Sequence, residues 1–193
     1  MILKGKKIIV TGGASGIGRA VCAIAAREGA DIVVADINPE MAEETVALVR
    51  EQNREAIIVE MDTSKRLDAE RMVKETVAAF GTIDGIVCGA IKLVPGKLEE
   101  LPEEDWDMVM DIGLKGYFLC AQAAGRIMLE KGSGSIAMFG AGHLSVAFIA
   151  MMEITDVIDF VVDDNPHKRG MIMPIGGIEI LGSDSLYSRG VRL

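Results

Sequence analysis

Short apolar runs alternate with helix-length amphipathic stretches along most of this 193-residue sequence. The runs KKIIVTG (6–12) and DIVVADI (31–37) are rich in β-branched residues, and GRAVCAIAAREGA (18–30) between them has apolar residues at helical spacing. Strands that are apolar on both faces and separated by helices are typical of a parallel sheet covered on both sides. The pattern therefore predicts a three-layer, doubly wound α/β fold.

The alternation continues beyond these first elements, and a long helical region over 103–132 is interrupted near Gly113. Further strands are expected at 55–62, 83–90, 135–141 and 157–164, and further helices at 39–53, 67–81 and 144–153. We expect one Rossmann-like domain over 1–193, with strand order 3-2-1-4-5-6. After residue 165 we expect turns and short extended pieces, with MIMPIGGIEI (171–180) as a small hairpin or an edge segment.

Composition excludes several classes of protein. A formal charge of −9 without a Lys/Arg cluster argues against a nucleic-acid partner, and no apolar run approaches the ~20 residues of a membrane span. The first strand follows the N-terminus directly, so we expect no secretory segment and a cytoplasmic location. The cysteines Cys22, Cys88 and Cys120 lie far apart in apolar surroundings, which favours buried thiols over disulfides or metal ligands.

A glycine-rich turn, TGGASGIGRA (11–20), follows the first strand and opens the first helix. Gly12, Gly16 and Gly18 let the backbone approach a pyrophosphate, the helix N-terminus supplies N–H groups, and Ser15 can add a hydroxyl donor. The alternative is a turn that only packs the helix against the strand. The strand, turn and helix in sequence, with an acid in the expected place, favour dinucleotide binding.

That acid is Asp36, at the end of the second strand. A carboxylate there accepts hydrogen bonds from ribose hydroxyls and repels a 2′-phosphate, so NAD is favoured over NADP. Asp62, which ends the third strand, is an equally good candidate for an adenine contact and for a helix-capping acid.

Residues 1 to about 133 resemble the short-chain dehydrogenase/reductase family. TGGASGIG matches the family's TGxxxGxG cofactor motif, and LEELPEEDWDMVMDIGLKGYFLCAQAA is similar to its fourth and fifth helices. The resemblance implies NAD as cofactor, and dimer contacts through those helices, although an apolar helix stripe equally suits a core. It assigns these residues to the cofactor: Gly12, Ser15, Gly16, Ile17, Gly18, Asp36, Ile37, Asp62, Thr63 and Ala90.

The family's proton-transfer residues are not found where the resemblance places them. Its NNAG motif reads CGAI here, from Cys88 to Ile91, and its helix asparagine is replaced by Gly113. Ala141 stands where the family has a serine, and neither Tyr117 nor Tyr187 is followed by a lysine four residues later. Without these groups an alkoxide formed by hydride transfer would be uncompensated, so we expect no catalytic residue of the family type.

Other polar residues offer weak substitutes. His143 and His167 have no partner in the sequence pattern and are interpreted as surface or loop histidines. Asp163 and Asp164 lie at the expected carboxyl end of the sixth strand, but a DDNP turn that caps its own backbone explains them as well. No set of residues has metal-ligand spacing.

From about residue 135 the chain resembles a second family, the C-terminal domain of C-methyltransferases that act on nucleotide sugars. The strand ending in GAG and the stretch IDFVVDDNP carry this resemblance, which implies fold and not methyl transfer, because the family's SAM-binding domain is absent. The change of family at KGSGS (131–135) suggests an engineered chimera of segments 1–133 and 134–193.

Three functions remain. The first is a designed or recombined scaffold that binds NAD and is inert as a reductase. The second is an NAD-dependent oxidoreductase of the short-chain dehydrogenase type that acts through other residues. The third is a natural cofactor-binding or regulatory protein that has lost catalysis.

Overall fold

The computed structural model describes residues 1–97, 99–138, 160–163, 165–174 and 176–182. The described chain divides into two compact units, Met1–Ala137 and Met138–Arg192. The helix expected at 144–153 lies outside the described residues, as do Ala141, His143, Asp164 and Tyr187. A single domain over 1–193 stays a prediction.

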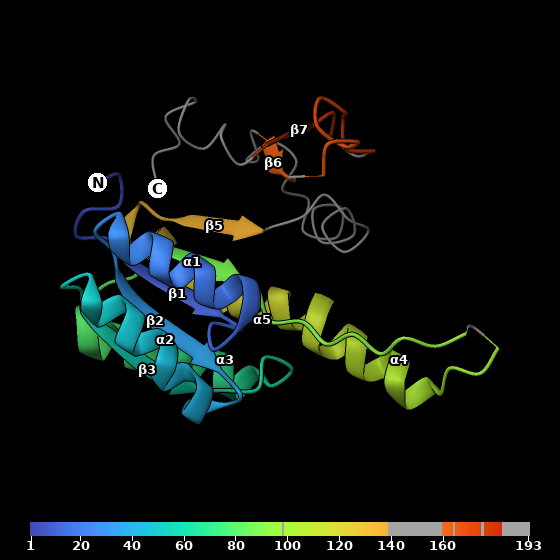
Figure 1. Cartoon of the computed structure of the whole chain (residues 1–193), viewed down its shortest axis with the longest axis horizontal. Coiled ribbons are helices and arrows are strands. Elements are labelled where there is room, and N and C mark those ends of the chain that lie inside the picture. The colour runs from blue at the N-terminus through green and yellow to red at the C-terminus, as the bar shows by residue number, and fades with distance from the viewer. Residues whose placement is uncertain (98, 139–159, 164, 175, 183–193) are drawn as a thin grey trace. The chain divides into compact units, whose positions relative to one another are not determined.

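The described elements follow one another as strand and helix up to the fifth strand (Figure 1). They are β1 (Lys7–Thr11), α1 (Gly16–Arg27), β2 (Asp31–Asp36), α2 (Pro39–Glu51), β3 (Ala56–Glu60), α3 (Arg66–Phe80), β4 (Gly85–Cys88), α4 (Glu103–Met110), the π-helical turn η1 (Asp111–Lys115), α5 (Gly116–Lys131), β5 (Ser135–Met138), β6 (Phe160–Val162) and β7 (Glu179–Leu181).

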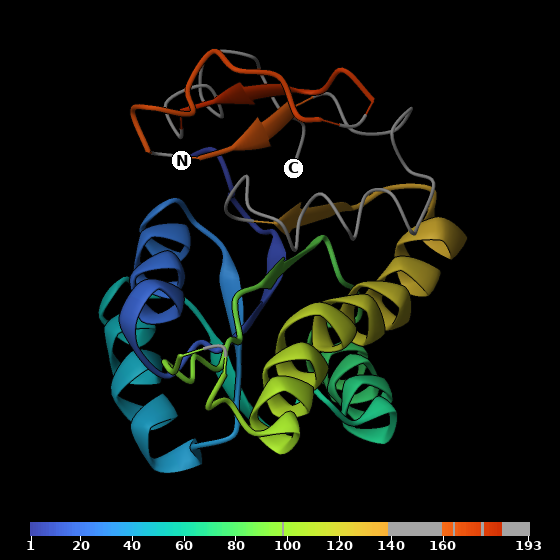
Figure 2. The same cartoon turned by 90° about the vertical axis from the view of Figure 1, so that its right-hand side faces the viewer.

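The first unit contains the expected parallel sheet. Its strand order is β3-β2-β1-β4-β5, and Ile9 of β1 lies opposite Val33 of β2 and Ile86 of β4. Helices α1 and α2 cover one face, and α3 and α5 cover the other (Figure 2). The three-layer α/β fold and the first five strands of the predicted order are confirmed.

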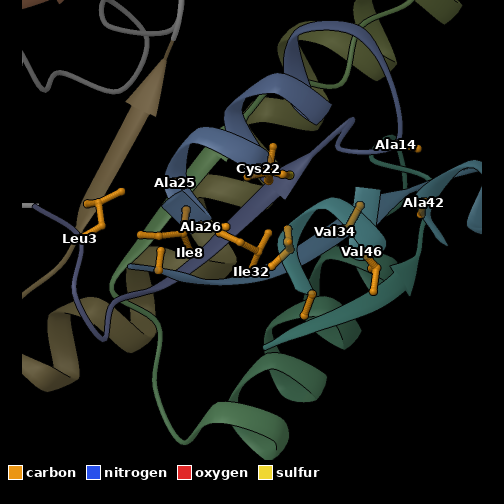
Figure 3. Close-up of a cluster of buried hydrophobic side chains, with 14 residues drawn as sticks. Leu3, Ile8, Ala14, Cys22, Ala25, Ala26, Ile32, Val34, Ala42 and Val46 are labelled. Atoms are coloured by element: carbon orange, nitrogen blue, oxygen red, sulfur yellow. The ribbon is translucent and has the colours of Figure 1, made fainter. Parts of the chain in front are cut away.

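The core between the sheet and helices α1 and α2 is aliphatic. Small residues such as Ala25 and Ala26 of α1 pack against Ile8 and Ile32 of the sheet (Figure 3). Val10, Val33 and Val34 have no exposed surface at all, which explains why both faces of these strands carry apolar residues. The core fixes α1 against the sheet, and α1 begins at the glycine-rich turn.

The long helical region after β4 is interrupted where the sequence predicts. Between α4 and α5 the five residues of η1 form a π-helical turn around the buried Gly113. The side-chain hydroxyl of Thr63 donates to the Ile112 carbonyl (3.3 Å), and a Cβ on Gly116 would lie only 3.0 Å from the Thr63 Cβ. A π turn of this kind often marks a functional region of a helix.

Two carboxylates lie at the amino end of the sheet. Asp31 accepts hydrogen bonds from the side chains of Lys7 and Arg54, and Asp84 accepts one from the Lys7 backbone N–H at 2.9 Å and one from Lys131. Burial by itself would raise the pKa of both carboxyls, but the hydrogen bonds from Lys7 to Asp31 and from Lys131 to Asp84 lower it below the ordinary value. Both groups therefore favour the folded state as carboxylates.

The second unit corrects one prediction. The sixth expected strand corresponds to β6, which forms a two-stranded parallel sheet with β7 and not an edge of the five-stranded sheet. The segment between β6 and β7 is long enough for the crossover that two parallel strands require. The sequence pattern did not reveal β7 as the partner of β6. For 171–180 the sequence left open a small hairpin or an edge segment, and the contacts are those of the hairpin: Met173 N–H donates to Ile178 O and Ile180 N–H to Met171 O, at 2.7 and 2.8 Å.

Candidate functional site

The glycine-rich turn joins the carboxyl end of β1 to the first turn of α1. Ser15 is the N-cap residue of α1 and is exposed to solvent. Its side chain makes no capping hydrogen bond to the first turn of the helix. The first N–H groups of a helix have no intrahelical partner, and they carry the positive end of the helix dipole. The turn therefore presents backbone donors and a hydroxyl to solvent, as an anion site requires.

The three glycines of the motif have different surroundings. A Cβ on Gly18 would lie 2.0 Å from the Gly12 carbonyl oxygen, and a Cβ on Gly12 would lie 2.8 Å from the Ala90 Cα. Gly16 has a φ of +51° and an open space where a Cβ would stand. Gly12 and Gly18 therefore allow the protein's own backbones to approach each other, whereas Gly16 leaves room at the surface of the turn.

Asp36 lies next to this turn. One carboxylate oxygen accepts a hydrogen bond from Ala14 N–H (2.9 Å) and the other accepts one from Asn38 N–H (3.0 Å). A carboxylate has about four lone-pair sites, so a half-buried Asp36 with two protein donors can still accept bonds from ribose hydroxyls. Ile17 and Ile37 are 69% and 68% exposed and flank the turn and the end of β2 in sequence.

Asp62 and Thr63, which follow β3, are bonded within the protein. Asp62 accepts hydrogen bonds from the N–H and the hydroxyl of Ser64 (3.0 and 2.7 Å) and pairs with Lys65 at 3.2 Å. Burial by itself would raise the pKa of the Asp62 carboxyl, but these hydrogen bonds lower it below its ordinary value. This is the geometry of an Asx turn that precedes α3; the N-cap residue of the helix is Lys65, so neither of the two roles that the sequence leaves open for Asp62 is established. Thr63 is buried against η1, where its hydroxyl donates to the Ile112 carbonyl.

The end of β4 is tied to β1. The Thr11 hydroxyl oxygen accepts Gly89 N–H at 3.1 Å and Ala90 N–H at 3.4 Å. Ala90 is therefore held beside Gly12, at the same edge of the sheet as the glycine-rich turn. This edge, at the carboxyl ends of parallel strands, is where α/β sheets bind ligands.

The groups near the expected position of proton transfer hold their protons. Burial raises the pKa of the Cys88 thiol, with a smaller contribution from Cys120, and burial also raises the pKa of the half-buried Tyr117. Gly113 supplies no side chain. Tyr117 is the one tyrosine among the described residues, and Ala121 follows it four places later.

Sequence reasoning missed three residues around the turn. Thr11 fixes the end of β4, Thr45 of α2 donates its hydroxyl to the Gly13 carbonyl at 3.0 Å, and Arg19 of α1 donates to the Ala14 carbonyl. Arg19 directly follows the motif, which was the available signal. Thr45 carried no signal, because its partner lies 32 residues earlier in the chain.

The second unit contains the DDNP turn. Asp163 accepts Asn165 N–H at 2.8 Å and pairs with Lys168 at 2.8 Å, and the Asn165 side chain accepts His167 N–H at 3.0 Å. These contacts support the interpretation of Asp163 as a turn-capping residue. Among the described residues no group of three or more metal-ligating side chains is found, and no described helix is long and apolar enough to cross a membrane.

The parallel sheet, the glycine-rich turn and the position of Asp36 together have the arrangement of a dinucleotide-binding α/β fold. The family model for short chain dehydrogenases matches residues 6–151, about three quarters of the chain. The chain belongs to the short-chain dehydrogenase family. A second family model, for the C-methyltransferase C-terminal domain, matches residues 126–190.

Individual relatives agree with the first match. The chain is 38% identical over 136 residues to an uncharacterized oxidoreductase of Thermotoga maritima, covering 70% of this chain and 53% of that protein. It is 37% identical over 131 residues to an NAD-dependent glycerol dehydrogenase of Listeria innocua, covering 68% of this chain and 50% of that one. The chain thus spans about half the length of these curated relatives.

Solved structures show the same fold. A short chain dehydrogenase from Mycobacterium paratuberculosis, determined with NAD bound, has a TM-score of 0.71 and 28% identity, over 84% of this chain and 72% of that one. The comparisons support an oxidoreductase family. They favour the second function above over a designed, inert scaffold, and they do not support an engineered origin.

Proposed function

We propose that this chain binds NAD at the turn between β1 and α1 and is an NAD-dependent oxidoreductase of the short-chain dehydrogenase type. The observation that carries the proposal is the open space at Gly16, beside the first turn of α1, whose N–H groups are not capped by the Ser15 side chain, and at the same edge of the sheet as Asp36. The NAD bound to the structural relative supports the choice of cofactor.

The residues present fit such a dinucleotide. The N–H groups of the first turn of α1 and the Ser15 hydroxyl would hold the pyrophosphate, and Asp36 would accept bonds from the adenosine ribose. Ile17, Ile37 and Ala90 would provide apolar contact at the same edge. Asp62 and Thr63 have protein partners already, so we propose that they shape the site through α3 and η1. When bound, NAD supplies the hydride chemistry.

Proton exchange in this proposal does not use the family's tyrosine and lysine, because the sequence has no YxxxK motif. The buried Gly113 in η1 and the apolar Ala90 and Ile91 after β4 favour a second candidate function, which is NAD binding without turnover. Losing the groups that stabilise a developing alkoxide costs orders of magnitude in rate. The two candidates share the cofactor site and differ only in the chemical step.

NADH titration followed by a turnover assay tests both. The purified chain should bind NADH more tightly than NADPH, because Asp36 repels a 2′-phosphate. Gly16→Ala should weaken NADH binding at least tenfold, or by about 1.4 kcal/mol, since the added methyl group occupies the open surface of the turn. Gly81→Ala is the matched control: Gly81 also has a positive φ (+77°) and open space at its Cβ, but it ends α3.

Equal NADH affinity in wild type and Gly16→Ala, with the Gly81→Ala control unchanged, would contradict the proposed site. Oxidation of NADH by a panel of ketones, or reduction of NAD by polyols, supports the oxidoreductase. Tight NADH binding with no turnover on that panel selects the second candidate.

Two finer points about the whole chain are also proposals. Two family models overlap at residues 126–151, which supports a join between two α/β segments in that region. Amplifying the gene from source DNA across this region tests it, and a genome in which either segment continues into its own full-length family would contradict it. We further propose that the chain is a cytoplasmic homodimer. Light scattering of the purified chain measures its mass and so tests the dimer.

A further inference from the structure

We infer that helix α2 and Arg19 hold the carbonyl groups of the glycine-rich turn away from the phosphate site, which makes Arg19 a positioning residue for NAD. The inference rests on the proposed function and names residues that the family motif does not assign. It concerns the peptide groups of Gly13 and Ala14, which precede the helix.

The Gly13 carbonyl is held from α2. Thr45 is fully buried, and its hydroxyl donates to the Gly13 oxygen at 3.0 Å. Only glycine fits at position 13, because a Cβ there would lie 2.9 Å from the Val10 oxygen. This carbonyl therefore points into the space between the turn and α2.

The two peptide groups that flank Ala14 are also held in place by hydrogen bonds. Ala14 N–H donates to Asp36 at 2.9 Å, and the Ala14 oxygen accepts two hydrogen bonds from Arg19, at 2.9 Å from Nε and 2.5 Å from Nη2. Helix α2 in turn holds the guanidinium: Nη1 pairs with Glu44 at 2.8 Å and Nη2 approaches the Met41 oxygen at 3.4 Å. The planar fork of arginine suits this arrangement, and lysine cannot reproduce it.

The direction of these carbonyls matters for an anion. An oxygen that turned toward the phosphate site would repel the pyrophosphate and would replace an N–H donor there. Contacts that hold the donors in place before binding lower the ordering cost that binding must overcome. Arg19 therefore acts through the Ala14 carbonyl, and its positive charge is already paired with Glu44.

Substitution of Arg19 separates this role from general stability. Arg19→Met should weaken binding of NADH and ADP about tenfold, as expected for the loss of a charge-assisted hydrogen bond. Competition by adenosine, which has no phosphate, should change much less, so the ratio of ADP to adenosine affinity falls. Arg19→Lys should behave like Arg19→Met because it lacks the fork. Arg27→Met, at the exposed end of the same helix, should bind all three ligands as wild type does.

Unchanged ADP affinity in Arg19→Met and Arg19→Lys would overturn the inference, and so would an equal loss for adenosine and ADP. Thr45→Val gives a second test, since it removes the bond to Gly13 and should lower the same ratio. Amide hydrogen exchange of the ligand-free protein is independent of NAD. Peptides that cover residues 12–19 should exchange about tenfold faster in Arg19→Met than in Arg27→Met.

The exchange experiment distinguishes the two possible failures. If the wild type binds no NADH but Arg19→Met speeds exchange in the turn, the proposed function fails and the positioning contact stands. If the wild type binds NADH and exchange in the turn is the same in all variants, the inference fails and the proposed function stands.

Discussion

Replacing Gly18 by alanine tests the central geometry of the turn, because two physical effects predict opposite signs. Alanine is a better helix former than glycine by up to about 1 kcal/mol, so propensity alone predicts a more stable protein. The structure predicts the reverse, since the new Cβ would lie 2.0 Å from the Gly12 oxygen and 2.8 Å from the Gly12 carbonyl carbon.

The magnitude follows from what can move. The obstructing atoms belong to the backbone of Gly12, whose N–H is bonded to the Ala35 oxygen at 2.8 Å, so the turn and the end of β1 must shift together. Overpacking of this kind costs about 3 kcal/mol, and the gain in propensity leaves a net loss of about 2 kcal/mol. In a chain of this length the melting temperature should fall by about 4–8 °C.

Urea and thermal unfolding followed by far-UV circular dichroism measure the change. Ala20→Gly calibrates the propensity effect, because Ala20 is exposed in the same turn of α1, and it should cost about 1 kcal/mol. A Gly18→Ala protein that melts at or above the wild-type temperature would refute the close approach of α1 to Gly12, and with it the geometry of the proposed site.

Three further outcomes are expected. The lowered pKa values of Asp31 and Asp84 mean that these carboxylates stabilise the fold above about pH 4, and that this contribution is lost as pH falls through their folded-state pKa values. The free energy of unfolding should therefore drop less steeply in acid for Asp84→Asn than for wild type. Urea unfolding at a series of pH values measures this, and the same dependence of the unfolding free energy on pH in both proteins would contradict it. Burial raises the pKa of Cys22 and of Cys120 to about 12, so iodoacetamide at pH 8 should modify neither thiol until urea unfolds the chain, as mass spectrometry would reveal. Asp36→Asn should narrow the preference for NADH over NADPH about tenfold, and a preference that survives in fluorescence titrations would remove Asp36 from the ribose site.

Much of the fold was predictable because it depends on patterns that are local in the sequence. Apolar runs such as 31–37 bounded by helices define two-sided strands, and Gly113 marks the interruption before α5 that became η1. The pairing of β6 with β7 was not predictable, because any short apolar strand can pair with several edges and the choice depends on contacts between distant residues.

The sequence by itself determined the class of protein. A strand, a glycine-rich turn, a helix and an acid at the end of the next strand predict a dinucleotide-binding fold, because each requirement is local to a few residues. The same reasoning treats Gly12, Gly16 and Gly18 alike. Only the tertiary structure divides them into two that allow backbone contact and one that faces open space.

Tertiary structure also decided which polar groups are already occupied. Asp62 bonds to Ser64, Thr63 bonds to Ile112, and Arg19 and Thr45 hold carbonyls of a turn that the motif describes only by its glycines. The physical reason is that a hydrogen bond depends on distance and direction. For Arg19 and Thr45 these are set by the packing of α2 against α1, and for Thr63 by the position of η1. Residue type limits what a group can donate or accept, and the fold determines its partner.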